Sequence, residues 1–199
     1  MLFRSAATPG WRGRSTPTSR WRRCRKRCSL SQRRAPASKY WTLAAVAARP
    51  RLDIARAIGP SGRVAAFDIS GPMLTEGQRR AEFAGIANID WQEADPATAP
   101  LGGYDLLVSN FGVMFFGDPV AAFAHMCSAA RPGARMVFVC WRPVTENPWM
   151  KVPMDAVSPH LPPRPKAVPH APGMFAFADP ERIAEVLTEI GRASCRERV

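Results

Sequence analysis

Residues 63–74 read RVAAFDISGPML, and this stretch decides the fold that the sequence predicts. Residues 64–67 form a short apolar run that Asp68 ends, and Gly71-Pro72 prevents the run from continuing. Such a run is typical of a buried strand in a parallel sheet. Ligands of open α/β sheets bind beyond the carboxyl ends of the strands, where a carboxylate can accept hydrogen bonds from both hydroxyls of a ribose. Asp68 is therefore a candidate for binding a nucleoside cofactor; the alternative is an ordinary strand-end Asp that caps the following helix.

Strand-like and helix-like segments alternate along the rest of the chain. Apolar runs predict strands at residues 63–67, 88–93, 104–109 and 134–141. Helical spacing and end signals predict helices at residues 52–58, 72–84, 119–130 and 179–190. Ser70 and Asp118 are the expected N-caps of two of them, and Arg131-Pro132-Gly133 is the expected stop of the third. This order predicts an α/β fold: a Rossmann-like, open, mostly parallel sheet with helices on both faces, incomplete at both ends.

Charge is distributed unevenly over the chain, whose net charge is +12. Residues 1–51 hold 14 of the 28 Lys and Arg and no acid, so residues 52–199 have a net charge of 14 − 16 = −2. The net positive charge of the whole chain therefore does not favour nucleic-acid binding by residues 52–199. The five Cys follow no disulfide framework, which favours reduced thiols and a cytoplasmic location. No run reaches the roughly 20 apolar residues of a membrane span.

Residues 1–51 contain no acidic residue, and their apolar residues do not recur at the spacing of a helix or a strand. They fit a basic arm for nucleic acid, an organellar transit peptide, or a coding stretch translated in the wrong frame. Reading codons 39–51 from their third bases forces a Leu-Asp pair at residues 40–42 and permits Val-Leu-Asp-Val-Gly-Cys-Gly, a strand followed by a glycine-rich turn. The frame would be restored near Arg51. Asp68 then lies about 20 residues beyond the glycines, as expected for a ribose-binding acid.

These observations divide the chain into three parts. Residues 1–51 are expected to be disordered or poorly structured and out of frame. Residues 52–190 are expected to form the Rossmann-like domain, with the Pro-rich residues 143–177 as an insertion or lid. Residues 191–199 read as an artificial tail, and we expect the natural chain to continue beyond Glu189 into further antiparallel strands.

Four motifs stand in order: GRVAAFDIS, QEADPATAPL, YDLLVSNFGVMFF and RPGARMVFVCW. In this order and spacing they resemble class I S-adenosylmethionine-dependent methyltransferases, most nearly the small-molecule group that resembles ubiquinone/menaquinone-biosynthesis enzymes. The resemblance covers about residues 52–190. It implies S-adenosylmethionine as cofactor and a small-molecule methyl acceptor, without nucleic acid as partner. The alternatives are a nicotinamide-dependent oxidoreductase on a similar fold, a basic nucleic-acid-binding protein that relies on residues 1–51, or a non-functional fragment.

The resemblance also implies a cofactor site at the ends of three strands, made of Asp68, Ile69, Met73, Ala94, Asp95, Ser109, Asn110 and Phe111. Asp68 would bind the ribose hydroxyls, and Asp95 would accept a hydrogen bond from the exocyclic amine of adenine. Ile69 would pack beside the adenine, and residues 109–111 would lie beside the methionine moiety. Each residue has an ordinary structural alternative; Asp95, for instance, precedes Pro96 and could simply begin a turn.

The sequence departs from the family where a glycine-rich loop should face the methionine moiety. Residues 43–47 read LAAVA there, and alanines resist the positive φ angles that glycines allow. We therefore expect weak binding of S-adenosylmethionine, and the central first strand could be absent as well. His125, His160 and His170 are candidate bases, with His125 more typical of a structural residue. No catalytic residue is assigned, and the sequence contains no metal-ligand motif.

Overall fold

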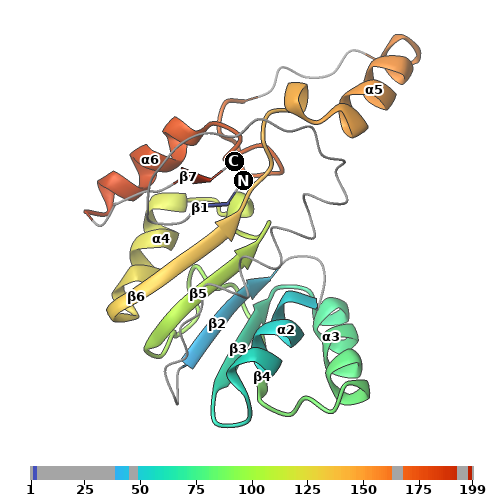
Figure 1. Cartoon of the computed structure of the whole chain (residues 1–199). Helices are drawn as coiled ribbons and strands as arrows, with labels where there is room; N and C mark the ends of the chain where they lie inside the picture. Colours follow the sequence, from blue (N-terminus) through green and yellow to red (C-terminus); the bar gives the residue numbers. More distant parts are fainter. Residues whose placement is uncertain (1, 4–38, 45–48, 163–167, 192–196, 199) are drawn as a thin grey trace.

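The computed structural model describes residues 2–3, 39–44, 49–162, 168–191 and 197–198. Its centre is a seven-stranded sheet in the order β4-β3-β2-β5-β6-β1-β7 (Figure 1). The strands are β1 (Leu2–Phe3), β2 (Lys39–Ala44), β3 (Arg63–Asp68), β4 (Ile89–Glu93), β5 (Tyr104–Asn110), β6 (Ala130–Val139) and β7 (Glu197–Arg198). The strands from β4 to β6 in this order are parallel. At one edge, β1 pairs antiparallel with β6, and β7 pairs antiparallel with β1.

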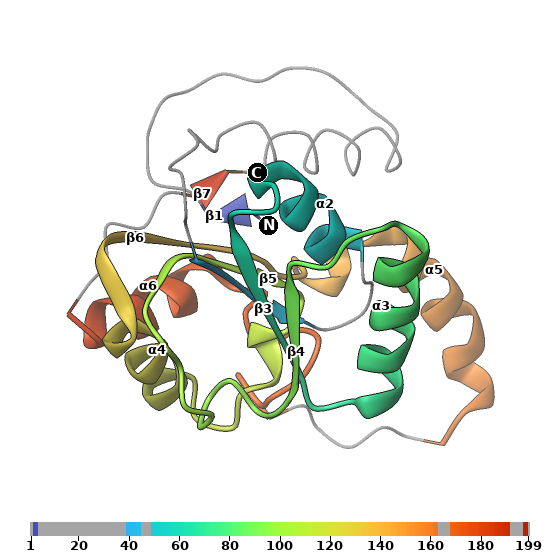
Figure 2. The same cartoon turned by 90° about the horizontal axis from the view of Figure 1, so that it is seen from below.

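Helices cover both faces of this sheet. They are α2 (Arg49–Ile58), α3 (Gly71–Phe83), α4 (Pro119–Ser128), α5 (Pro148–Val157) and α6 (Pro180–Glu189). Adjacent residues of a strand point to opposite faces, so Leu106 and Leu107 belong to different hydrophobic clusters. Leu106 packs with Ile54 of α2, whereas Leu107 lies in the cluster that holds Phe123 of α4 and Ile183 of α6. Figure 2 shows α2 and the α4–α6 pair on opposite sides of the strands, so the predicted fold class is confirmed.

The central strand β2 pairs in parallel with both of its neighbours. Leu43 stands in register with Phe67 of β3, and Ala44 with Asn110 of β5. The expectation that this strand could be absent is therefore wrong. Residues 39–44 and 49–51 are a strand and the start of a helix rather than a poorly structured segment. A strand ladder uses backbone groups, and Tyr, Trp and Thr favour extended structure, so KYWTLA can fill the position. The expectations for residues 4–38 and 45–48 lie outside the described residues.

The tripeptide Arg131-Pro132-Gly133 lies inside β6 and does not separate α4 from it. The pairing of β6 with β5 jumps from Tyr104–Ala130 to Leu106–Arg135, which places a bulge between these positions. Gly133 has a φ of +81°, a conformation that glycine adopts without steric cost. The predicted stop is therefore a bulge that lets the strand begin at Ala130.

The two predicted N-caps differ. Asp118 caps α4, because its side chain accepts a hydrogen bond from the backbone N–H of Ala121 at 2.9 Å. Ser70 occupies the N-cap position of α3 but makes no side-chain cap hydrogen bond. Its own backbone N–H donates to Asp68 instead, at 3.1 Å.

Short segments at the two chain ends extend the sheet. Residues 197–198, which belong to the predicted artificial tail, form β7, which pairs with β1, and Leu2 of β1 pairs with Val139 of β6. An open sheet edge offers unpaired backbone groups to any extended segment within reach, which explains this pairing. The artificial origin of the tail stays a prediction. The described residues of the Pro-rich segment 143–177 form α5 and short 3₁₀ turns and add no strand to the sheet. The role of that segment as a lid stays a prediction.

Candidate functional site

Two acids lie at the carboxyl ends of neighbouring parallel strands, as the sequence predicts. Asp68 is the last residue of β3 and stands in register with Glu93, the last residue of β4. The backbone N–H of Ala94 donates to the carbonyl oxygen of Asp68 at 3.1 Å, so the chain leaves β4 beside Asp68. Asp95 follows directly. This placement is confirmed, whereas the binding roles of the two acids stay predictions.

The Asp68 carboxylate is buried and has a partner on each oxygen. Oδ1 accepts the hydrogen bond from Ser70, and Oδ2 accepts one from Nη2 of Arg51 at 3.1 Å. The side-chain exposures of Arg51 and Asp68 are 5% and 8%. The Arg51 guanidinium also lies over the ring of Trp91, 5.6 Å from its centroid. Burial lowers the pKa of Arg51, against the opposing effect of the Asp68 charge.

Sequence reasoning missed Arg51. The residue stands at the border of a segment expected to be out of frame, and no local pattern links it to an acid 17 positions further along the chain. Its position follows instead from helix α2, whose Ile54 and Ala55 pack in one cluster with Val64 of β3. A helix anchored on the neighbouring strand carries Arg51 to the strand-end acid.

Ile69 and Met73, which the resemblance places beside an adenine, follow Asp68 in the chain, and this role stays a prediction. Ile69 is 74% exposed, which is unusual for an isoleucine directly after a buried strand. Met73 is half-buried in the first turn of α3. An exposed aliphatic side chain beside a strand-end carboxylate offers an apolar surface to a flat ring.

Asp95 forms a turn, which is the structural role that the sequence offers as the alternative to binding adenine. Its Oδ1 accepts a hydrogen bond from the N–H of Ala97 at 2.8 Å, and its carbonyl oxygen accepts one from Ala99 at 2.8 Å. The residue is exposed, and Ala94 before it is half-buried. The turn therefore fixes the Asp95 carboxylate at the end of β4 while leaving it at the surface.

Ser109 supports the segment that follows β5. It is fully buried, and its hydroxyl oxygen accepts hydrogen bonds from the N–H groups of Gly112 and Val113 at 3.2 and 3.3 Å. Asn110, the last residue of β5, is half-buried. Phe111 has a φ of +67°, a left-handed conformation that bulky residues rarely adopt. Strain of this kind is concentrated at functional sites, so the loop at Phe111 is a candidate for contact with a ligand.

A row of aromatic rings begins at Phe111. Its ring stacks on Trp141 with centroids 4.7 Å apart and planes 12° apart. Trp141 in turn lies 5.3 Å from Trp149 of α5, at an angle of 51°. Trp149 is 56% exposed. The sequence analysis did not find this row, because its members are far apart in the chain and meet only beyond the ends of β5 and β6.

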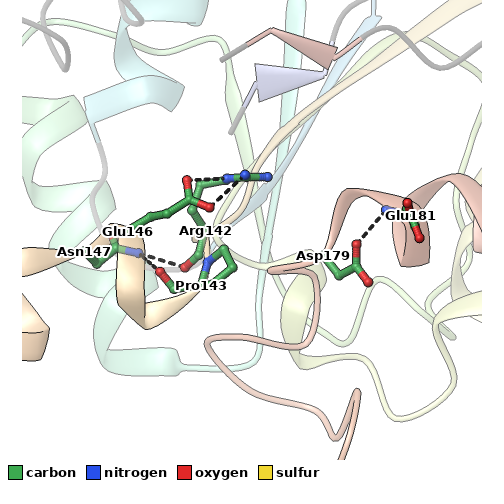
Figure 3. Close-up of polar contacts among 6 residues, drawn as sticks. All are labelled: Arg142, Pro143, Glu146, Asn147, Asp179 and Glu181. Atoms are coloured by element: carbon green, nitrogen blue, oxygen red, sulfur yellow. Dashed lines mark hydrogen bonds and ion pairs between the residues drawn. The ribbon is translucent and has the colours of Figure 1, made fainter.

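Polar contacts hold the segment that carries these tryptophans (Figure 3). Arg142 donates to both carboxylate oxygens of Glu146, at 2.8 and 2.9 Å. The buried Asn147 donates from Nδ2 to the carbonyl oxygens of Arg142 and Pro143, at 2.7 and 2.9 Å. Asp179, in the same figure, caps α6 by accepting a hydrogen bond from the N–H of Glu181. The turn between β6 and α5 is therefore closed by hydrogen bonds, which fixes the approach of α5 to β6.

The candidate bases lie in different surroundings. His125 on α4 has Nε2 2.8 Å from the carbonyl oxygen of Ala99, which ties α4 to the loop before β5 and supports a structural role. His160 and His170 are exposed, and His170 has a φ of +58°.

Within the described ranges, no three His, Cys, Asp or Glu side chains gather in a way that could hold a metal ion. The described helices are all too short or too polar to cross a membrane.

Comparison with known proteins shows the family and the fold of this chain. The sequence model of the ubiE/COQ5 methyltransferase family matches residues 17–168, beginning well before Leu52. The chain is 29% identical over 106 residues to the ubiquinone/menaquinone biosynthesis C-methyltransferase UbiE of Roseobacter denitrificans, over 52% of this chain and 42% of that protein. It is 32% identical over 95 residues to the mitochondrial 2-methoxy-6-polyprenyl-1,4-benzoquinol methylase of Leishmania donovani, over 47% and 33%.

The matched part thus spans less than half the length of either curated relative. A solved SAM-dependent methyltransferase from Aquifex aeolicus has the same fold, with a TM-score of 0.62 and 14% sequence identity. The similarity covers 84% of this chain and 78% of the Aquifex aeolicus chain.

Proposed function

This chain belongs to the ubiE/COQ5 methyltransferase family, and we propose that it binds S-adenosylmethionine and transfers the methyl group to a small-molecule acceptor. One observation carries the proposal: Asp68 ends β3 and Asp95 comes closely after β4, so both lie at the carboxyl ends of neighbouring parallel strands, on the same side of the sheet's end. In open α/β sheets this end is where ligands bind, and an acid after the second strand of the wound unit accepts hydrogen bonds from ribose hydroxyls.

The residues at this end fit the adenosine part of the cofactor once Arg51 is displaced from Asp68. The Asp68 carboxylate would accept the ribose hydroxyls, and the exposed Asp95 carboxylate would accept the adenine amine. The exposed Ile69 would pack on the adenine, with Met73 and the backbone of Ala94 beside it. The bound cofactor would supply an electrophilic methyl group on a sulfonium.

Residues at the end of β5 and directly after it would act at the methionine end of the cofactor. Asn110 and Phe111 are proposed to lie beside the methionine moiety. Ser109, which is fully buried, would act by holding the loop that carries Phe111. In an in-line methyl transfer the protein mainly aligns the nucleophile and excludes water, and no base is needed unless the acceptor must lose a proton. A rigid loop and ordered aromatic side chains are suited to that task.

We assign the acceptor to planar aromatic molecules, such as quinols. The row of Phe111, Trp141 and Trp149 ends in a half-exposed indole beyond the carboxyl ends of β5 and β6. Aromatic rings stack with a gain of about 0.5–1.5 kcal/mol beyond the burial of area. The name of the Leishmania donovani relative specifies a benzoquinol, which is consistent with this class.

Isothermal titration calorimetry with S-adenosylmethionine tests the cofactor assignment. Asp95→Ala should weaken binding roughly tenfold, because a hydrogen bond to a charged group contributes about 1.5 kcal/mol or more. Asp90→Ala is the matched control, since Asp90 is an exposed acid of β4 whose side chain bonds only locally, to Gln92. Equal affinity of Asp95→Ala and the unchanged chain would contradict the adenine contact. Absence of binding in every folded variant would contradict the proposed function.

A further inference from the structure

We propose that Arg51 competes with the cofactor for Asp68 and so sets the affinity of this chain for S-adenosylmethionine, an inference that rests on the proposed function. The observation is the buried pair between Arg51 Nη2 and Asp68 Oδ2, which are 3.1 Å apart. The other carboxylate oxygen accepts the N–H of Ser70 at 3.1 Å. The acid that should receive two ribose hydroxyls thus has both oxygens bound within the chain.

The competition follows from the burial of both partners. Arg51 is 4% exposed and Asp68 8%, so the guanidinium fills the space next to Oδ2. A ribose hydroxyl that approached Oδ2 would have to replace it. Separating a buried ion pair leaves charges in a medium of low dielectric constant, which is costly unless new partners form. The cofactor's neutral hydroxyls would compensate Asp68 but would leave the Arg51 cation without its carboxylate.

Two further contacts hold Arg51 in place. The Trp91 ring lies under its guanidinium at 5.6 Å, a cation–π distance. The helix that carries Arg51 is fixed by Asn88, whose Nδ2 lies 3.1 Å from the carbonyl oxygen of Ala55 and 2.8 Å from that of Gly59. Displacement of Arg51 therefore requires its side chain to leave Trp91, because the backbone of α2 is anchored.

Substitution of Arg51 by Met tests the inference, because Met keeps an apolar stem and removes the cation. Arg56→Met is the matched control: Arg56 lies on the same helix, is 55% exposed and pairs with Asp53 at 3.7 Å. Calorimetry with S-adenosylhomocysteine as the probe should show at least tenfold tighter binding by Arg51→Met, which corresponds to about 1.4 kcal/mol. Arg56→Met should bind within about twofold of the unchanged chain, as expected for an exposed pair.

A measurement without ligand accompanies the titration. Loss of the cation next to Trp91 should change the tryptophan emission of Arg51→Met, and this change should vanish in a Trp91→Phe background. Equal or weaker binding by folded Arg51→Met would overturn the inference while leaving the proposed function standing. If neither protein binds the probe, both proposals fail. If circular dichroism shows Arg51→Met unfolded, Arg51→Gln removes the charge with a polar side chain and decides the same question.

Discussion

Gly77→Ala should destabilise the chain although alanine favours helices. Gly77 is buried in α3, and a Cβ at this position would lie 2.6 and 2.8 Å from two carbons of the Trp91 ring. Contacts this short force the ring or the helix to move, and overpacking of this kind costs about 1–3 kcal/mol. The better helix propensity of alanine returns only about 0.5–1 kcal/mol. The free energy of unfolding, from urea denaturation followed by circular dichroism, should fall by roughly 1–2 kcal/mol.

The same substitution in a Trp91→Leu background provides the control. Without the indole the clash disappears, so Gly77→Ala should then raise the free energy of unfolding by about 0.5–1 kcal/mol. The change of sign is a double-mutant coupling between Gly77 and Trp91. If Gly77→Ala stabilises the chain with Trp91 intact, the close packing of α3 on β4 is refuted. The support of the Arg51 side chain by Trp91 would then be in question as well.

Three further substitutions have defined outcomes. Asn88→Ala removes an amide that bonds the backbone carbonyls at the end of α2, and should lower the free energy of unfolding in urea by about 1–3 kcal/mol. Burial raises the pKa of the Cys140 thiol from 9.0 to about 12. The protonated thiol therefore stabilises the folded chain in full below pH 9.0, and this stabilisation is lost as the pH rises to about 12. The stability difference between the unchanged chain and Cys140→Ala, measured against pH, should shrink over that interval. Trp149→Ala should raise the KM for an aromatic acceptor severalfold, with little change in the Kd of S-adenosylhomocysteine, in a coupled methyl-transfer assay.

The strands from β3 to β6 and the helices α2, α3, α4 and α6 could be predicted because their signals are local, whereas β1, β2, β7 and α5 were not predicted. A short apolar run closed by turn residues gave β3 and β5, and Asp118 capped α4 as its residue type suggests. Gly133 shows the limit of such signals. A glycine after proline indicates a turn, but whether it ends a helix or forms a bulge depends on the strand that pairs beside it. The partner of Ala130 is Tyr104, which no local window of sequence contains.

In the candidate site, too, the features with local signals could be predicted and those that depend on tertiary packing could not. The strand-end positions of the two acids follow from local patterns. The aromatic row instead joins side chains that come after β5, after β6 and from α5, and these meet only through tertiary packing. The family resemblance implies that Ser109 lies beside the ligand, which stays a prediction; its buried hydroxyl accepts hydrogen bonds from two backbone N–H groups, a contact that no local pattern predicts. Whether a side chain can touch a ligand or instead holds a loop in place depends on its exposure, and exposure is set by the whole fold.

Arg51 lies at the end of the segment for which a second reading frame is predicted. Two features of the chain each predict weak cofactor binding: the buried Arg51–Asp68 pair and the alanines at positions 45 and 47. Leu43 and Ala44, expected in the same loop, are the last two residues of β2. Alanine at two positions that need positive φ would cost about 1 kcal/mol or more each, roughly a hundredfold in affinity together. If Arg51→Met alone gives tight binding, the ion pair is the main barrier. If binding stays weak in Arg51→Met and becomes tight when residues 29–50 are replaced by the sequence decoded in the other frame with Arg51 kept, the loop is the main barrier, and the decoded glycines are supported as the functional sequence.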